Sequence, residues 1–291
     1  MFEFTKISNV EYLNRGDFAC PGCVAGLSMR HALKVLGEKT VVVIPASCWS
    51  IIAGGLPSTA LQVPLIHVPF ATAGAVASGI KNALIEKGDD DINVMCWGGD
   101  GGTFDIGLQA ISGAAERKED IIYVCYDNEA YMNTGIQRSS ATPPGAWTTT
   151  TPAGNPIIYD KKDMFSIIAA HNPAYVATAT IAYPEDFYRK FEKARDLKGF
   201  RFIHLLSTCP PGWRIDSKDS IKVLRLAVES GFFVLMEKEM GEDVRVTYKP
   251  KKLRDIKEYF KVQGRYKHLD EETILEIQHK VEKRLKSLGI A

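Results

Sequence analysis

The sequence predicts an α/β protein with a doubly wound, mostly parallel sheet, helices on both faces and a C-terminal extension. Short apolar runs rich in β-branched residues alternate with longer helical patterns between about residues 24 and 206, which is typical of a parallel sheet. The chain has 291 residues, of which 45% are hydrophobic, so it can bury a large core. Beyond residue 248 it becomes rich in Lys and Arg. We therefore expect one domain over residues 1–248 and a basic extension over residues 249–291.

The expected elements follow from the spacing of apolar residues. Helices are indicated where apolar positions recur at helical spacing, and buried strands where a short apolar run holds several β-branched residues. The expected helices span residues 24–36, 71–86, 104–117, 165–170, 184–198 and 271–288. The expected strands span residues 40–44, 92–97, 121–126, 175–178 and 202–206. Such sheets bind ligands beyond the carboxyl ends of their strands.

Charge and composition limit the classes of partner. The net charge of +1 gives no strong field for nucleic acid or an anionic membrane. Residues 61–80 lack charged side chains but are interrupted by Pro and Gly, a poor pattern for a membrane span, and the N-terminus lacks a signal-peptide pattern. We therefore expect a cytoplasmic protein. The basic segment 249–291 is either a solvated extension or a docking arm for a partner subunit or an acidic electron carrier.

A Gly-rich turn and a strand end form the first candidate site. Gly98-Gly99-Asp100-Gly101-Gly102-Thr103 follows the expected strand 92–97 and precedes a helix, so its N–H groups can approach an anion at the helix N-terminus. Asn128 ends the next strand along the chain. Since parallel strand ends can lie side by side, Asp100 and Asn128 could face one hard cation through oxygen ligands. A structural turn with an unrelated Asn is the alternative.

The six cysteines are too few for a disulfide scaffold and indicate metal or redox chemistry. Cys96 and Cys125 lie inside apolar strands and are expected in the core. The other four lie in turns or at strand ends: Cys20, Cys23, Cys48 and Cys209. Four thiolates suit zinc or a 4Fe–4S cluster, and the single tight pair favours the cluster. A redox-active dithiol formed by that pair would leave the other two thiols without a role.

Together these residues resemble the β subunit of the pyruvate:ferredoxin oxidoreductase family. The resemblance covers about residues 20–213 and rests on two long motifs. They are GGDGGTFDIGLQ at residues 98–109 and YDNEAYMNTGIQ at residues 126–137, which continues into a Thr-rich stretch at 141–151.

The resemblance implies three cofactors: thiamine diphosphate, Mg²⁺ and one 4Fe–4S cluster. It implies that Asp100, Asn128 and the Ala130 backbone carbonyl hold Mg²⁺, and that Cys20, Cys23, Cys48 and Cys209 hold the cluster. Asn133 would face the thiazolium and substrate, and the long polar segment 139–160 would help to close the site. The remaining implied cofactor contacts are Ser47, Gly99, Gly101, Gly102, Thr103 and Thr134.

The implied activity is oxidative decarboxylation of a small carboxylic acid, with electrons leaving through the cluster to ferredoxin. The resemblance implies that the Glu that activates the cofactor is supplied by the α subunit and not by this chain. The resemblance therefore implies an obligate hetero-oligomer with an α subunit and a ferredoxin-like subunit, without nucleic-acid or membrane partners.

Two departures from the family pattern bear on the substrate. Residues 46–50 read ASCWS, where the pyruvate enzymes commonly have Thr-Gly-Cys, then Met or Leu, then Glu, and residues 69–73 lack the usual Phe-Glu-Asn-like string. Trp49 and Ser50 would thus stand near the substrate, and two carboxylates would be missing. Less negative charge favours a more anionic substrate. We therefore predict oxalate without coenzyme A, with pyruvate or another 2-oxoacid plus coenzyme A as the alternative.

Two further classes of function share parts of this pattern. A non-redox thiamine-diphosphate decarboxylase or synthase would use Asp100 and Asn128 but give the four cysteines no purpose. A zinc-stabilised binding module would use the cysteines alone.

Overall fold

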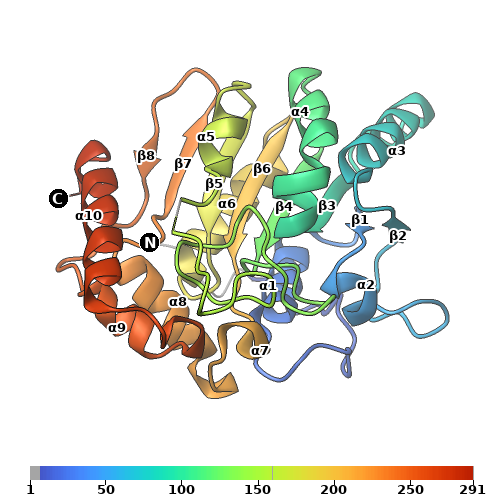
Figure 1. Cartoon of the computed structure of the whole chain (residues 1–291). Helices are drawn as coiled ribbons and strands as arrows, with labels where there is room; N and C mark the ends of the chain where they lie inside the picture. The colour runs from blue at the N-terminus through green and yellow to red at the C-terminus, as the bar shows by residue number, and fades with distance from the viewer. Residues whose placement is uncertain (1–6, 159, 291) are drawn as a thin grey trace.

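The strands form one mixed sheet in the part of the chain that the computed structural model describes, residues 7–158 and 160–290. The eight-stranded sheet has the order β2-β1-β3-β4-β6-β5-β7-β8 (Figure 1). All neighbours from β2 to β5 pair in parallel, whereas β7 and β8 add an antiparallel edge. The strands are β1 (Thr40–Pro45), β2 (Leu65–Val68), β3 (Asn93–Gly99), β4 (Ile122–Asp127), β5 (Tyr175–Ala179), β6 (Arg201–Leu206), β7 (Met236–Glu239) and β8 (Arg245–Val246).

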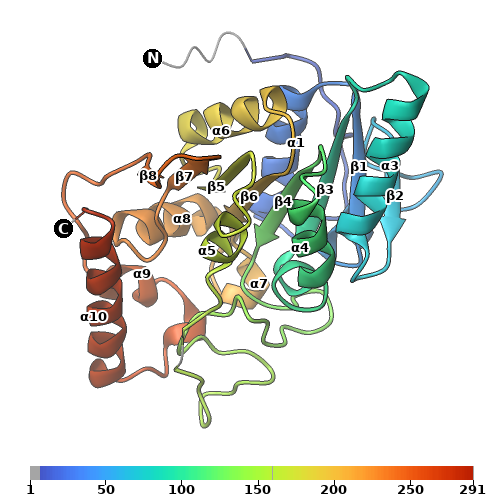
Figure 2. The same ribbon diagram turned by 90° about the horizontal axis from the view of Figure 1, so that it is seen from above.

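Helices cover both faces of the sheet (Figure 2). One core cluster includes residues of α1, α6 and α8, and a second includes residues of α3, α4 and α5. β4 and β6 are buried along their whole length, and most of their residues are accordingly apolar. The α-helices are α1 (Val24–Leu36), α2 (Cys48–Ile52), α3 (Ala73–Lys87), α4 (Leu108–Glu116), α5 (Met164–Ala169), α6 (Pro184–Asp196), α7 (Pro210–Trp213), α8 (Ser220–Glu229), α9 (Ile256–Lys261) and α10 (Glu271–Ser287).

Three short helical turns complete the described elements. They are the π-helical turn η2 (Gly101–Ile106) and the 3₁₀ turns η3 (Ser217–Asp219) and η4 (Gly264–Tyr266). The C-terminal segment packs on the domain, because apolar side chains of α9 and α10 belong to the same core cluster as α1 and α6. No helix within the described ranges is long and apolar enough to cross a membrane.

The predicted fold class is confirmed, and most expected elements lie within two residues of their predicted bounds. One expected helix is wrong at its start. Residues 104–117 were expected as a single α-helix, but the chain forms η2 first and α4 begins only at Leu108. The wide turn brings Gly107 so close to the Gly102 carbonyl that a Cβ would lie 2.1 Å from that oxygen. Only Gly fits there.

Candidate functional site

Three neighbouring strand ends build the candidate site. β1, β3 and β4 are adjacent in the sheet, and Gly99 lies opposite Tyr126 in the register. A cavity of about 170 Å³ opens where these strands end, between the β1–α2 connection, the Gly-rich turn and the loop 128–134. The predicted site residues that line it are Ser47, Cys48, Ser50, Gly99, Asp100, Gly101, Gly102, Asn128, Ala130, Asn133 and Thr134.

The side chains of Asp100 and Asn128 meet, as expected from their places at two neighbouring strand ends. One terminal atom of the Asn128 amide lies 2.9 Å from Asp100 Oδ1 and 2.9 Å from the Ala130 carbonyl oxygen. With the amide nitrogen there, both contacts are hydrogen bonds; with the amide oxygen there, three oxygens converge on one point. Convergent carboxylate, amide and carbonyl oxygens are ligands that Mg²⁺ accepts. The residues therefore fit the implied cation.

The Asp100 carboxyl is buried, and Ser139 donates a hydrogen bond to its Oδ2. Burial first, and then the nearby Asp127 carboxylate, raise the pKa of Asp100 well above its usual range. A buried carboxylate is stabilised when a cation binds it. The environment of Asp100 thus favours a metal ligand over an isolated ion.

At Gly101 and Gly102 the backbone itself lines the cavity, and there is little room for a side chain at either position. A Cβ at Gly101 would lie 2.2 Å from Tyr131 Cε1, and a Cβ at Gly102 would lie 3.3 Å from Phe70. Thr103 is buried and does not line the cavity; its hydroxyl donates to the Gly99 carbonyl over 2.8 Å. Thr103 therefore braces the turn, whereas its glycines form the wall. Such a backbone cradle suits the diphosphate of the implied cofactor.

The four predicted cluster cysteines gather beside this cavity. Burial first, and then the neighbouring thiols of Cys209 and Cys23, raise the pKa of Cys48 to about 12. Burial also raises the pKa of Cys209 to about 11, and Cys20 and Cys23 again contribute. Cys96 and Cys125 are in the core, as expected. Burial is also the main cause that raises the pKa of Cys23.

Hydrogen bonds hold the separate cysteine segments together. Ser217 Oγ donates to the Pro21 carbonyl over 2.9 Å, and Ser220 Oγ donates to the Gly22 carbonyl over 2.8 Å. These bonds fix the Cys-x-x-Cys turn against the segment that follows α7. No three His, Cys, Asp or Glu side chains within residues 7–158 and 160–290 are arranged around a single metal ion. Cluster thiolates bind separate irons, so a cluster does not require that arrangement.

The group of four cysteines adjoins the cavity. Cys48 lines the cavity, and so does Met132, whose sulfur would lie 2.2 Å from a Cβ at Gly212. Gly212 lies three residues after Cys209, in α7, and the Cys209 sulfur would lie 3.4 Å from the same Cβ position. A cofactor in the cavity would therefore adjoin a cluster on these thiols.

Trp49 was predicted to stand near the substrate, and the structure contradicts this prediction. Its side chain is 0% exposed in the core, edge-on to Trp97 with 5.8 Å between ring centroids, and it does not line the cavity. The capping box of Ser47 and Ser50 begins α2 at Cys48, and this local helix turns Trp49 inward. Its bulk therefore cannot select a substrate in this cavity by direct contact. Ser50 lines the cavity, and its hydroxyl accepts a hydrogen bond from the Ser47 N–H.

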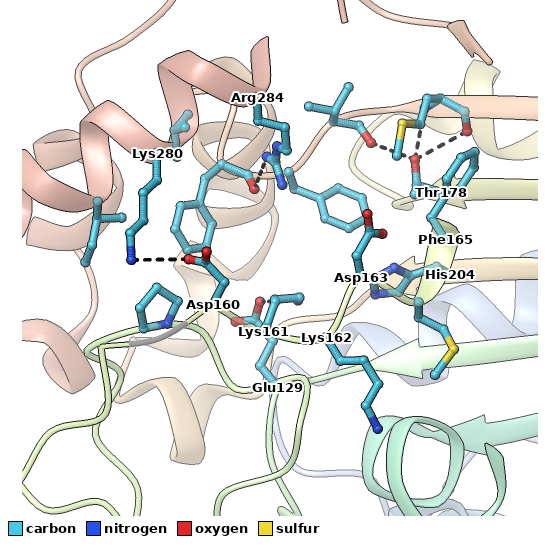
Figure 3. A pocket seen from close by; sticks show the side chains of 18 residues that line it. Glu129, Asp160, Lys161, Lys162, Asp163, Phe165, Thr178, His204, Lys280 and Arg284 are labelled. Atoms are coloured by element: carbon cyan, nitrogen blue, oxygen red, sulfur yellow. Dashed lines mark hydrogen bonds and ion pairs between the residues drawn. The ribbon is translucent and has the colours of Figure 1, made fainter. Parts of the chain in front are cut away.

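Next to Asn128 lies a buried charge network that the sequence did not predict. Lys161 contacts Asp127 at 3.0 Å and Glu129 at 3.1 Å, and His204 Nε2 lies 2.7 Å from Asp127 Oδ2. Burial alone would raise the pKa of Asp127, but Lys161 and His204 lower it to about 2. The network borders a second cavity, of about 270 Å³, between the sheet and α10 (Figure 3). In the sequence, the motif Tyr126-Asp127-Asn128-Glu129 marks the two acidic residues of this network. No motif marks their partners Lys161 and His204, which lie far away in the chain.

The fold and the site define a thiamine-diphosphate-binding domain. Residues 49–205 match the family model described as thiamine pyrophosphate enzyme, C-terminal TPP binding domain. The chain is 50% identical to pyruvate synthase subunit PorB of Methanothermobacter thermautotrophicus over 98% of this chain and 100% of that protein. It is also 50% identical to ketoisovalerate oxidoreductase subunit VorB of Pyrococcus horikoshii over 90% of this chain and 88% of that protein.

The chain therefore belongs to the 2-oxoacid:ferredoxin oxidoreductase β-subunit family, as its motifs predicted. The fold is also similar to a 2-oxoglutarate:ferredoxin oxidoreductase from Magnetococcus marinus, with a TM-score of 0.60 and 21% identity. That match covers 94% of this chain and 98% of the other.

Proposed function

We propose that this chain binds thiamine diphosphate, Mg²⁺ and one 4Fe–4S cluster as the β subunit of a 2-oxoacid:ferredoxin oxidoreductase complex. The observation that carries the proposal is one cavity that is lined both by Asp100, Asn128 and Ala130, whose oxygens converge, and by Cys48. A non-redox thiamine enzyme needs only the oxygen ligands for the cation and has no use for the cysteine. The neighbouring Cys20, Cys23 and Cys209 favour the redox enzyme.

Each part of the cavity has a distinct task in this proposal. Asp100, Asn128 and the Ala130 carbonyl hold the cation, and the glycines of the turn admit the diphosphate. When bound, thiamine diphosphate supplies the electron sink for decarboxylation, and the cluster supplies one-electron transfer to ferredoxin. Asn133 lies on the cavity wall and is the proposed contact to the substrate. An α subunit supplies the activating Glu, so the active complex is a hetero-oligomer that also includes a ferredoxin-like subunit.

We propose pyruvate as the substrate, with coenzyme A as the acyl acceptor. A relative that is matched over its whole length is named pyruvate synthase, and another relative is named ketoisovalerate oxidoreductase. These names favour a 2-oxoacid over the oxalate predicted from residues 46–50. Trp49, one of the two side chains predicted to stand near the substrate, lies in the core and does not line the cavity.

The test uses the intact complex, produced with its partner subunits and purified without oxygen. Ferredoxin reduction is measured with pyruvate, 2-oxoisovalerate and oxalate, each with and without coenzyme A. We expect the fastest reduction with pyruvate plus coenzyme A, and a brown protein with absorbance in the visible blue. Faster reduction with oxalate alone would reject the substrate assignment, and a colourless complex would reject the cluster.

A variant links the activity to the site. Asp100→Asn keeps the size of the side chain but removes the charge that faces the cation. We expect it to weaken Mg²⁺-dependent binding of thiamine diphosphate while the visible absorbance of the cluster is retained. Asp91→Asn is the control, because Asp91 is an exposed residue before β3 that pairs with Lys39.

A further inference from the structure

Glu129, directly after the proposed metal ligand Asn128, adopts a backbone conformation that is rare for any residue except Gly. Its φ is +68°, in the left-handed region, and its side chain is 2% exposed. The Glu129 N–H donates to Asp127 Oδ1 over 2.9 Å, and its carbonyl accepts from Thr142 Oγ1 over 2.7 Å. Because a buried carboxylate is costly without partners, the shape of this turn depends on the groups that contact it.

Arg265, from the C-terminal segment, is one of those partners. Its Nη2 donates to Glu129 Oε2 over 2.6 Å, while Lys161 contacts Oε1 at 3.1 Å, on the other carboxylate oxygen. Figure 3 shows Glu129 and Lys161 close together on the loop that borders the second cavity. The Arg265 guanidinium also lies 3.8 Å from the centre of the Trp213 ring, and its Nε donates to Gln263 Oε1 over 2.9 Å. A planar guanidinium can stack and donate at the same time, which a Lys ammonium cannot match.

Trp213 connects Arg265 to two parts of the candidate site, the turn at Asn128 and the segment that carries Cys209. Its Nε1 donates to the Asn128 carbonyl over 2.8 Å, and its backbone N–H donates to the Cys209 carbonyl over 2.8 Å. The carbonyl of the next residue, Arg214, accepts a hydrogen bond from the Gly264 N–H over 3.0 Å. A Cβ at Gly264 would lie 2.7 Å from Arg214 Cβ, so the C-terminal segment packs directly on the end of α7.

We propose that Arg265 and Trp213 are positioning residues that hold the Asn128 end of the metal site and the Cys209 end of the cysteine cluster in one fixed relation. This inference rests on the proposed function, which gives those two ends their ligands. Neither side chain lines the cofactor cavity, so both act through the residues that they contact. The C-terminal segment is then part of the cofactor site, whether or not it also docks a partner.

The test compares variants of the intact, anaerobically purified complex. Arg265→Gln removes the charge and the stacking cation, and Arg265→Lys restores the charge alone. Trp213→Phe keeps an aromatic ring under Arg265 but removes the hydrogen bond to Asn128. Arg254→Gln is the matched control, because Arg254 lies in the same segment but forms exposed ion pairs with Glu229 and Glu258.

Two measurements separate positioning from simple stability. Binding of thiamine diphosphate with Mn²⁺, a paramagnetic substitute for Mg²⁺, is titrated by electron paramagnetic resonance at a temperature where all variants are folded. The midpoint potential of the cluster is measured on the same samples. We expect Arg265→Gln to raise the Kd for Mn²⁺ at least about tenfold and to shift the potential, because groups that orient metal ligands commonly have effects of this size. Trp213→Phe and Arg265→Lys fall between Arg265→Gln and the wild type, and Arg254→Gln matches the wild type.

Wild-type Mn²⁺ affinity in both Arg265→Gln and Trp213→Phe overturns the inference and leaves the proposed function intact. If Arg265→Gln does not assemble, Trp213→Phe alone decides by the same criterion. A wild-type complex that binds no thiamine diphosphate rejects the proposed function, and this inference with it.

Discussion

The substitution Gly101→Ala adds one methyl group at a crowded point of the cofactor cavity. Its Cβ would lie 2.2 Å from Cε1, 2.5 Å from Cδ1 and 2.7 Å from Cζ of Tyr131. Tyr131 cannot move freely, because its hydroxyl donates to Asp105 Oδ2 over 2.8 Å and its ring packs against Phe70 at 6.0 Å between centroids. The tyrosine must therefore shift, and its hydrogen bond to Asp105 must stretch or break.

The contacts set the size of the expected effect. Overpacking costs about 1–3 kcal/mol, and losing a hydrogen bond to a charged group costs about 1.5–3 kcal/mol. Tyr131 is only half-buried, so its ring can relieve part of the overlap toward the cavity. We therefore expect Gly101→Ala to lower the free energy of unfolding by roughly 2–4 kcal/mol. Binding of thiamine diphosphate should weaken as well, because the displaced ring lies on the cavity wall.

Thermal unfolding of the intact complex and titration with thiamine diphosphate measure the two effects. Gly79→Ala is the matched control, since Gly79 is an exposed residue of α3 and, apart from its own helix, no heavy atom of the described residues lies within 4 Å of its Cβ position. That control should gain about 1 kcal/mol, because Ala favours a helix. Tyr131→Leu combined with Gly101→Ala should regain part of the lost stability, as expected for directly coupled residues. An unchanged melting temperature and unchanged cofactor affinity in Gly101→Ala would refute the reasoning.

Three further predictions concern other parts of the molecule. Cys209→Ser should lower the iron content and visible absorbance of the complex, whereas Cys96→Ala in the core should not; equal absorbance in both would argue against Cys209 as a ligand. Burial alone would raise the pKa of Glu237, but hydrogen bonds from a tyrosine, an arginine and a lysine lower it from 4.5 to about 2. The stability from this group is present above its ordinary pKa of 4.5 and is lost as the pH falls toward 2. Glu237→Gln should therefore flatten acid unfolding in that range, and an unaltered acid profile would contradict this. Lys190→Met should cost roughly 3 kcal/mol in thermal or urea unfolding, because Asp186 loses its buried partner at 2.6 Å. Stability equal to the wild type would disprove that estimate.

Segments with their own local signal could be predicted well. The helix expected at residues 24–36 is α1 with the same bounds, and Gly37, with φ of +79°, follows its last residue. The strand expected at 121–126 is β4, shifted by one residue. Because β3 and β4 are sequence neighbours in a parallel sheet, the meeting of Asp100 and Asn128 could be predicted too.

Short or edge elements could not be predicted from the same patterns. β2 has only four residues between Pro64 and Pro69, and His67 interrupts its apolar run. β7 and β8 pair antiparallel at the edge and contain charged residues, so they lack the apolar signature of the central strands. Such strands form because they pair with a neighbouring strand of the sheet, and the local pattern of apolar residues does not reveal this pairing.

Side-chain direction was the main error within the site. Trp49 follows a predicted ligand, and proximity in sequence suggested proximity to the substrate. The step of one helical residue from Cys48 is enough to direct Trp49 into the core, while Ser50 lies on the cavity wall. Direction in a helix changes by about 100° per residue, so neighbours in sequence can face opposite environments. To predict the direction of the Trp49 side chain, one must know that α2 begins at Cys48, and the capping box determines that start.

The C-terminal segment illustrates why composition and packing must be considered separately. Its basic character suggested a solvated arm, and exposed side chains such as Lys283 and Lys286 still allow docking, which stays a prediction. Along the same helix, Ile277, Val281 and Leu285 recur every four residues and are buried in the main core. Lys283 and Lys286 are therefore exposed, whereas the apolar face of α10 is held by the domain, toward which Lys280 and Arg284 also point as part of the lining of the second cavity. Arg265 shows the same difference between composition and packing. By composition it is one more basic residue of the segment, but in the structure it is buried and pairs with the distant Glu129.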